Sequence, residues 1–124
     1  MRQRVLVVED TADNRRILRD LLTSAGYDLI ESVDGADGVA KAQQHRPDLI
    51  LMDIQLPGMD GYEATRRIKA DPALRHIPII AVTSYALSGD EAKTRAAGCD
   101  AYVAKPFSPR QLLGKIRELL PPPA

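Results

Sequence analysis

Leu49-Ile50-Leu51-Met52-Asp53 is the stretch that decides the fold, because an unbroken apolar run ends directly in an acid. A continuous apolar run of this length is typical of a strand that is buried on both faces of a parallel sheet. Two further runs, Val5 to Val8 and Ile79 to Val82, have the same character. The sequence therefore predicts three central parallel strands, one of which carries Asp53 at its carboxyl end.

Two weaker strands lie further out along the chain, at Asp28 to Ser32 and at Ala101 to Val103. Both mix polar residues with apolar ones, which suits the edges of a sheet better than its centre. Helical patterns separate the strands. The first helix, Ala12 to Ala25, stops at Gly26 and carries an apolar stripe that we expect to face the sheet. The stripe consists of Ile17, Leu18, Leu21 and Leu22.

Two later helices begin with a hydroxyl at the N-cap and an acid or amide three residues on, at Ser88 and at Ser108. The chain thus repeats a strand and a helix five times. Right-handed crossovers turn that order into a doubly wound α/β sandwich with helices on both faces of a five-stranded sheet. Residues 1–124 fit a single domain with a Pro-rich tail, Pro121 to Ala124.

Composition argues against several classes of function. The 17 Lys and Arg residues balance the 17 Asp and Glu residues, so the chain lacks the basic field that binds nucleic acid through its phosphates. No apolar run approaches the ~20 residues that cross a bilayer. Cys99 is the single cysteine, and we expect it to be a small buried hydrophobe. Without a disulfide or a signal peptide, the chain is expected to be cytoplasmic.

Chemically active residues follow four of the predicted strands. In open parallel α/β sheets, ligands bind outside the carboxyl ends of the strands. The residues at these ends are Glu9 and Asp10 after the first strand, Asp53 at the third, Thr83 after the fourth and Lys105 after the fifth. All five side chains are therefore expected to share one rim of the sheet.

Three carboxylates on one rim repel one another unless a cation neutralises them. Mg²⁺ prefers oxygen ligands and typically takes one or two carboxylates plus a phosphate oxygen, which Glu9, Asp10 and Asp53 could satisfy. Thr83 and Lys105 could then grip phosphoryl oxygens and spread the charge that develops during in-line transfer. The pattern predicts phosphoryl transfer with Asp53 as the nucleophile.

Each of these residues alone has a simpler interpretation. Glu9 and Asp10 can simply favour the positive N-terminus of the next helix. Asp53 can be an N-cap or turn residue, Thr83 a loop hydroxyl and Lys105 a solvated charge. The functional interpretation depends on finding all five at the same end of the sheet.

Four motifs carry a family resemblance, and they are Val8-Glu9-Asp10, Met52 to Gly61, Val82 to Ala86 and Gly98 to Phe107. With them the chain resembles the receiver domains of two-component response regulators over essentially its whole length. Among these it is similar to stand-alone cell-cycle regulators and to the receiver modules of hybrid kinases. The resemblance implies a flavodoxin-like fold with strand order 2-1-3-4-5.

The resemblance also implies roles for the rim residues. Asp53 would become an aspartyl phosphate. Mg²⁺ would be bound by Asp10, Asp53 and the Gln55 backbone carbonyl, with Glu9 supporting it directly or through water. Lys105 would pair with the phosphoryl group.

A switch follows from the same resemblance. Thr83 would turn to hydrogen-bond the phosphoryl group while Tyr102 turns inward, which transmits the new charge to the fourth helix, fifth strand and fifth helix. The Lys105–Pro106 bond is expected to be cis. Tyr85 is expected to shield the acyl phosphate, so self-catalysed dephosphorylation would be slow.

The expected partners are a histidine kinase or histidine-phosphotransfer protein that donates the phosphoryl group and a downstream protein that reads the switched face. The chain would be a phosphoacceptor switch rather than an enzyme, with no attached DNA-binding domain. A homodimer could form through that face or through the last helix. The apolar stripe of the last helix is expected mainly to pack in the core, although exposed parts of Leu112, Ile116 and Leu119 could support a dimer.

Three other functions compete with this interpretation. A haloacid dehalogenase-type phosphatase would need a second Asp where Gln55 stands, and an amide cannot transfer the proton. A flavodoxin-like FMN carrier would place phosphate beside Glu9 and Asp10, which would repel it. A receiver-like module that binds partners without phosphorylation would tend to lose the acceptor, the acids or the lysine, all of which are present.

Overall fold

Five parallel strands form one sheet in the order β2-β1-β3-β4-β5. The computed structural model describes residues 2–84 and 90–121. The strands are β1 (Arg4–Val8), β2 (Asp28–Ser32), β3 (Leu49–Asp53), β4 (Ile79–Thr83) and β5 (Ala101–Ala104). The helices are α1 (Ala12–Ser24), α2 (Gly35–His45), α3 (Gly61–Ala70), α4 (Asp90–Ala97) and α5 (Pro109–Leu119).

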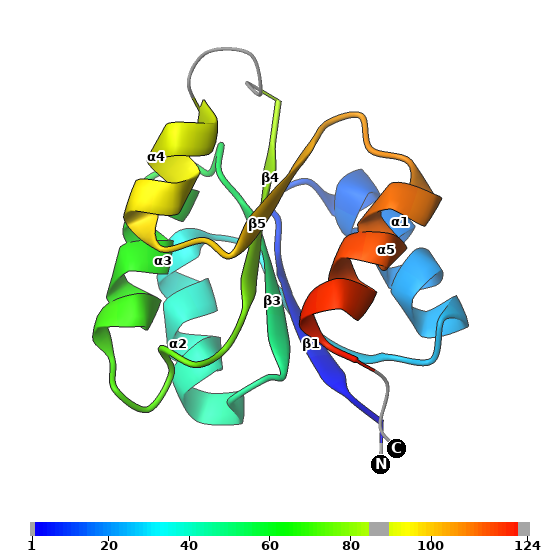
Figure 1. Cartoon of the computed structure of the whole chain (residues 1–124), viewed down its shortest axis with the longest axis horizontal. Helices are drawn as coiled ribbons and strands as arrows, with labels where there is room; N and C mark the ends of the chain where they lie inside the picture. Colours follow the sequence, from blue (N-terminus) through cyan, green and yellow to red (C-terminus); the bar gives the residue numbers. More distant parts are fainter. Residues whose placement is uncertain (1, 85–89, 122–124) are drawn as a thin grey trace.

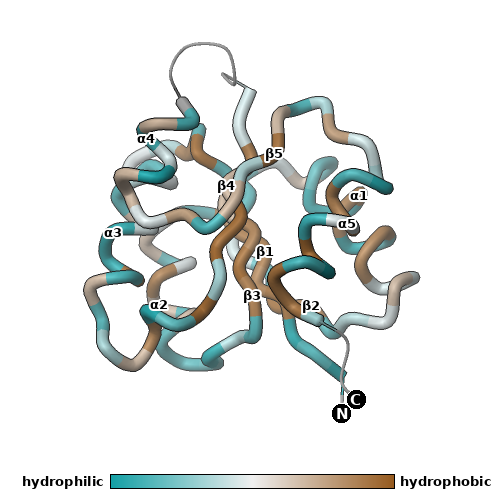
Figure 2. The backbone as a smooth tube through the Cα atoms, in the orientation of Figure 1, coloured by the Kyte–Doolittle hydropathy of each residue, from teal (hydrophilic) through white to brown (hydrophobic). Residues whose placement is uncertain are grey.

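The helices cover both faces of the sheet, with α1 and α5 on one side and α2, α3 and α4 on the other (Figure 1). The hydrophobic residues gather on the central strands, and the hydrophilic ones lie mostly on the helices and connections (Figure 2). The strand order, the parallel pairing and the two helical layers confirm the predicted doubly wound fold.

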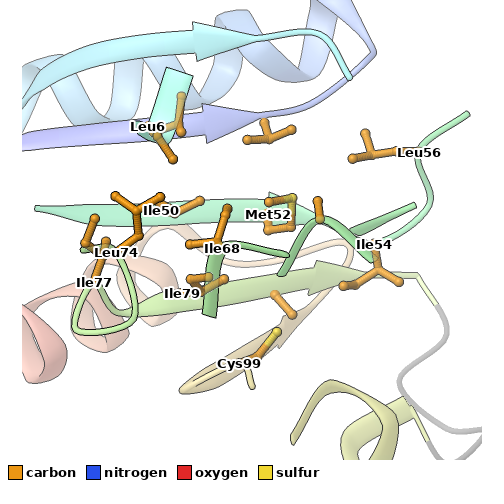
Figure 3. Close-up of a cluster of buried hydrophobic side chains, with 14 residues drawn as sticks. Leu6, Ile50, Met52, Ile54, Leu56, Ile68, Leu74, Ile77, Ile79 and Cys99 are labelled. Carbon is orange, nitrogen blue, oxygen red and sulfur yellow. The ribbon is translucent and has the colours of Figure 1, made fainter. Parts of the chain in front are cut away.

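Each face of the sheet has its own hydrophobic core. Under α1 and α5, Leu22 and Ile116 are fully buried against the odd-numbered residues of β1 and β3. On the opposite face, Ile50, Met52 and Ile68 belong to a larger cluster that reaches Cys99 (Figure 3). Because side chains alternate along a strand, a central strand must be apolar at every position to serve both cores.

The predicted strand boundaries agree with the structure to within one residue, and the two mixed-polarity strands are the edges β2 and β5. The Ser108 cap is confirmed, since its Oγ accepts a hydrogen bond from the backbone N–H of Gln111 at 3.0 Å. The predicted Ser88 cap lies outside the described residues.

One prediction about a helix face is wrong. Ile17 of α1 is 55% exposed, whereas Leu18 and Leu22 are buried. The four-residue stripe spans too wide an arc for the sheet to cover, so one edge of it faces solvent. In α5, Leu112 and Ile116 are fully buried, which confirms that this stripe packs mainly in the core, and Leu119 is its partly exposed member.

Within residues 2–84 and 90–121, no helix has the length and apolar character needed to span a membrane.

Candidate functional site

Three acids meet at the carboxyl ends of β1 and β3. Glu9, Asp10 and Asp53 each place a carboxylate oxygen within 4.8 Å of the others. Glu9 and Asp53 are only 2% and 3% exposed, whereas Asp10 is exposed to solvent. Buried carboxylates are costly unless they are paired and hydrogen-bonded, so the groups around them decide what this cluster can do.

Lys105 supplies the positive charge. Its Nζ lies 3.2 Å from Glu9 Oε1 and 3.2 Å from Asp53 Oδ2. Burial acts to lower the pKa of the Lys105 ammonium, but the neighbouring charges of Asp53 and Glu9 outweigh it and raise the pKa above its ordinary value. The lysine therefore stays charged at neutral pH and holds the two buried acids together.

Backbone amides satisfy the other oxygen of each buried acid. The Thr11 N–H donates to Glu9 Oε2 at 3.0 Å, and the Gln55 N–H donates to Asp53 Oδ1 at 3.1 Å. Each carboxylate thus has one oxygen bonded to a backbone N–H and the other paired with Lys105. This arrangement fixes the direction of both carboxylates.

The loop that connects β5 to α5 positions Lys105. The Lys105–Pro106 peptide bond is cis, as the family resemblance implies. The Lys105 N–H also donates to the Thr83 carbonyl at 2.8 Å, which ties this loop to the end of β4. Lys105 therefore reaches Asp53 from two strands away in the sheet and Glu9 from three strands away.

Gly61 shapes the site from the start of α3, a role that sequence reasoning missed. A Cβ at this position would collide with the carbonyl oxygen of Asp53 and lie 2.7 Å from the Ile54 Cα. The Gly61 N–H donates to the Ile54 carbonyl at 3.0 Å, so the helix begins directly against the end of β3. The sequence signal was Asp60-Gly61, because the Asp60 side chain caps α3 through the Glu63 N–H.

Thr83 and Tyr102 lie on the same face of the sheet. The strand register pairs Ala81 with Tyr102 and Thr83 with Ala104, and residues two apart on a strand share a face. Thr83 is fully buried at the end of β4. Tyr102 is half-buried and lines a pocket of about 200 Å³ between α4 and α5. Thr83 and Tyr102 therefore lie on adjacent strands, and Tyr102 is set back by two residues from the end of the sheet that carries the acids.

Gln55 reaches Thr83 from the loop after β3. Its Nε2 donates to Thr83 Oγ1 at 2.9 Å, and its Oε1 accepts from the Ser84 N–H at 3.0 Å. The structure therefore brings the predicted acids, Gln55, Thr83 and Lys105 to one rim. Tyr85 lies outside the described residues.

The comparison with protein families decides which family the chain belongs to. Residues 5–117 match the model of the response regulator receiver domain. The chain belongs to the response regulator receiver domain family. This receiver domain is 46% identical over 120 residues to the polar-differentiation response regulator DivK of Brucella anthropi, covering 97% of this chain and 98% of the relative. DivK of Brucella ovis is 45% identical with the same coverage.

Solved structures agree with this assignment. The receiver domain of the sensor histidine kinase PA1611 of Pseudomonas aeruginosa superimposes with a TM-score of 0.90 at 40% identity, covering 96% of this chain and 98% of that one. That structure has a magnesium ion coordinated in its active site cleft. The chemotaxis protein CheY4 of Vibrio cholerae superimposes with a TM-score of 0.91 at 29% identity, covering 97% and 100% of the two chains.

This receiver domain is therefore a signalling switch of a two-component system rather than an enzyme of the usual kind. Receiver domains work with kinases or phosphotransfer proteins and with downstream targets, and those are the kinds of partner to expect for it. The family and the strand order predicted from the sequence are both confirmed.

Proposed function

We propose that this receiver domain is switched by phosphorylation of Asp53. The observation that carries the proposal is the Asp53 carboxylate itself, which is buried, oriented by the Gln55 N–H and paired with Lys105 beside two further acids. A carboxylate held in one direction beside a fixed cation is suited to attack phosphorus in line.

The proposed reaction transfers a phosphoryl group from a phosphohistidine to Asp53. An Asp53 carboxylate oxygen attacks the phosphorus of a phosphohistidine, the P–N bond breaks, and its electron pair leaves with the imidazole, which takes up a proton from solvent. Lys105 pairs with the phosphoryl oxygens as charge builds on them, and the Thr83 hydroxyl donates a hydrogen bond to the same group. A small acyl phosphate can replace phosphohistidine as the donor, with a P–O bond breaking instead.

The residues on the rim fit a divalent cation such as Mg²⁺. Three carboxylate oxygens within 4.8 Å of one another form a hard-oxygen donor set, and exposed Asp10 leaves the cluster accessible to solvent. Asp10, Asp53 and the Gln55 backbone carbonyl would hold the ion, with Glu9 supporting it through water. When bound, the ion neutralises charge on the acids and on the phosphoryl group.

The same site would remove the phosphoryl group. Water attacks the phosphorus of the aspartyl phosphate, the bond to the Asp53 oxygen breaks, and the products are the carboxylate, inorganic phosphate and a proton released to solvent. We propose that this self-catalysed hydrolysis is slow and that residues 1–124 act as one unit in the cytoplasm. The output face would be α4, β5 and α5, read through Tyr102 by a downstream protein or by a second copy of the chain.

Intact-mass analysis after incubation with acetyl phosphate tests the proposal. We expect one phosphoryl adduct on the wild-type protein with Mg²⁺ and none when EDTA replaces the metal. Asp53→Asn should prevent the adduct, because an amide is a poor nucleophile. Asp13→Asn is the matched control, since Asp13 is an exposed acid of α1, and it should be phosphorylated like wild type.

An adduct that persists in Asp53→Asn would place phosphorylation elsewhere. If no adduct forms on the folded wild-type protein under any condition, a module that binds partners without phosphorylation becomes the better account.

A further inference from the structure

Gln55 is the residue that joins the phosphoacceptor to the switch threonine. Its backbone N–H donates to Asp53 Oδ1, and its side-chain amide bonds to Thr83 and to the backbone of Ser84. The side chain is half-buried in the loop between β3 and α3. One residue therefore contacts both the phosphoacceptor Asp53 and the switch residue Thr83.

The two side-chain contacts match the chemistry of a carboxamide. The Ser84 N–H can only donate, so it takes the amide oxygen, and the amide nitrogen is left to donate to the Thr83 hydroxyl. This bond uses a lone pair of the hydroxyl oxygen and directs Thr83 Oγ1 toward residue 55, two residues beyond the phosphoacceptor. Neither a hydrocarbon nor a shorter amide can make both contacts from the same backbone.

The contacts also extend the pairing between β3 and β4. The backbone ladder reaches Val82 through the Ile54 N–H, which donates to the Val82 carbonyl at 3.0 Å. The Gln55 side chain continues the connection to Thr83 and Ser84, where the chain leaves the sheet. The start of the β4–α4 connection is thus fastened to the loop that carries the acceptor.

We propose that the Gln55 side chain is a positioning residue that holds Thr83 and Ser84 in the resting position of the switch. The inference rests on the proposed phosphorylation of Asp53. When Thr83 turns its hydroxyl to a phosphoryl group on Asp53, Oγ1 must leave the amide, and any shift of the β4 end also strains the Ser84 contact. The two hydrogen bonds therefore oppose switching and set how completely phosphorylation shifts the population.

Titration with beryllofluoride, a phosphoryl analogue that would bind Asp53 in the presence of Mg²⁺, tests this role. In Gln55→Met, which keeps the length of the side chain and loses both contacts, we expect affinity to rise about three- to tenfold, the factor that corresponds to one lost neutral hydrogen bond. The amide NMR signals of Ser84 and its neighbours should move, without the analogue, toward their positions in the wild-type complex. Gln43→Met, an exposed position on α2, should change neither readout.

A double-mutant cycle with Thr83→Val shows whether the effect passes through the hydroxyl. If Gln55 acts through Thr83, most of the gain from Gln55→Met disappears in the Thr83→Val background. Gln55→Asn, whose amide is one methylene too short to span both contacts, should raise the affinity in the same direction. It serves as the second variant if Gln55→Met does not fold.

The outcomes separate this inference from the proposed function. If wild type binds the analogue but both Gln55 variants bind it equally well or more weakly, the inference is overturned and the phosphoacceptor assignment stands. An affinity gain of full size in the Thr83→Val background also overturns it. If folded wild type does not bind the analogue at all, both the proposed function and the inference fail.

Discussion

Lys105 is the single residue on which the electrostatics of the site depend. It is the cation paired with both buried acids, and each of those acids has its second oxygen on a backbone N–H. Removing one partner of a buried ion pair leaves an uncompensated charge, which costs more than the pair itself contributed. The lysine therefore stabilises the resting protein as well as serving the proposed chemistry.

Lys105→Met is expected to lower the free energy of unfolding by about 2–3 kcal/mol in metal-free buffer, because Glu9 and Asp53 lose their shared cation. Urea denaturation measures the change. Adding Mg²⁺ should recover part of the loss, since the ion would supply the missing positive charge. Lys93→Met, at an exposed position of α4, is the control and should be nearly neutral. Equal effects of the two substitutions would contradict this account.

The residues of the site were largely predictable, because parallel strands all end at the same rim and each strand end was visible as the end of an apolar run. Asp53 is the last residue of its strand, and Glu9 and Lys105 are the first residues after theirs, so the strand ends alone were enough to place them at the rim. The bonds of Gln55 to Thr83 and Ser84 depend on how the loop after β3 turns back toward β4, and no local pattern in the sequence encodes that turn.

At the scale of secondary structure, the start of α3 determines where the end of β3 lies. Gly61 lies so close to the Asp53 carbonyl that no side chain fits, whereas a Cβ added at Gly114 in α5 would have nothing within 4 Å of it. Gly61 and Gly114 therefore form a natural pair for comparison.

Gly61→Ala should lower the free energy of unfolding by about 1–3 kcal/mol, as overpacking against fixed backbone does. It should also slow phosphorylation, because relief of the clash moves the Asp53 backbone. Gly114→Ala should instead raise the free energy of unfolding by about 0.5–1 kcal/mol, since alanine is the better helix former. Denaturant melts of both variants check these signs, and a neutral Gly61→Ala would contradict the close approach.

The edge strand β2 is attached to α1 by an ion pair. Arg19 donates to both oxygens of Glu31 at 2.7 and 2.8 Å, and Arg15 lies 3.9 Å from the same carboxylate. The hydrogen bond from Arg19 holds the pKa of Glu31 below its ordinary value, although partial burial acts in the opposite direction. Bidentate pairs of this kind are among the stronger surface interactions.

Because the pKa of Glu31 is lowered by folding, its contribution to stability is present above the ordinary glutamate pKa and is lost as the pH falls through the folded-state value. Glu31→Gln should therefore cost about 1 kcal/mol near neutral pH and almost nothing in strong acid. Urea melts across the acid range test the sign. Glu63→Gln, which loses only exposed pairs within α3, should have a smaller effect near neutral pH.

Helices and strands were predicted well where one kind of contact determines their sequence. The central strands contain unbroken apolar runs because they serve two cores, so β1, β3 and β4 could be located from those runs alone. The buried face of a helix was harder to predict, because the part of its surface that the sheet covers depends on how the helix is rotated about its axis. That rotation exposes Ile17, and sequence periodicity does not fix it.

In the whole molecule, the start of β1 and the end of α5 lie close together at the end of the sheet opposite the acids (Figure 1). The Gln3 Nε2 donates to the Pro121 carbonyl at 2.9 Å. The rim that carries Asp53 is therefore clear of both ends of the described chain, and a partner can approach it without displacing either.

Cys99 reports the integrity of the whole fold. Burial raises the pKa of its thiol above the ordinary value, although a contact with Thr65 Oγ1 at 3.7 Å acts in the opposite direction. The raised pKa stabilises the fold below the ordinary thiol pKa, and this contribution is lost as the pH rises. Reaction with a disulfide reagent should be slow in the native protein and should follow the unfolded fraction in urea. A fast, complete reaction without denaturant would contradict the burial of Cys99.

The most direct test of the account is chemical mapping of the phosphorylated residue. Borohydride reduces an aspartyl phosphate to homoserine, which peptide mass spectrometry can locate after treatment with acetyl phosphate and Mg²⁺. The account predicts homoserine at position 53 and at no other acid, with none in a sample prepared with EDTA. Homoserine at position 10, or a phosphoryl adduct that borohydride leaves intact, would contradict the assignment of Asp53 as the phosphoacceptor.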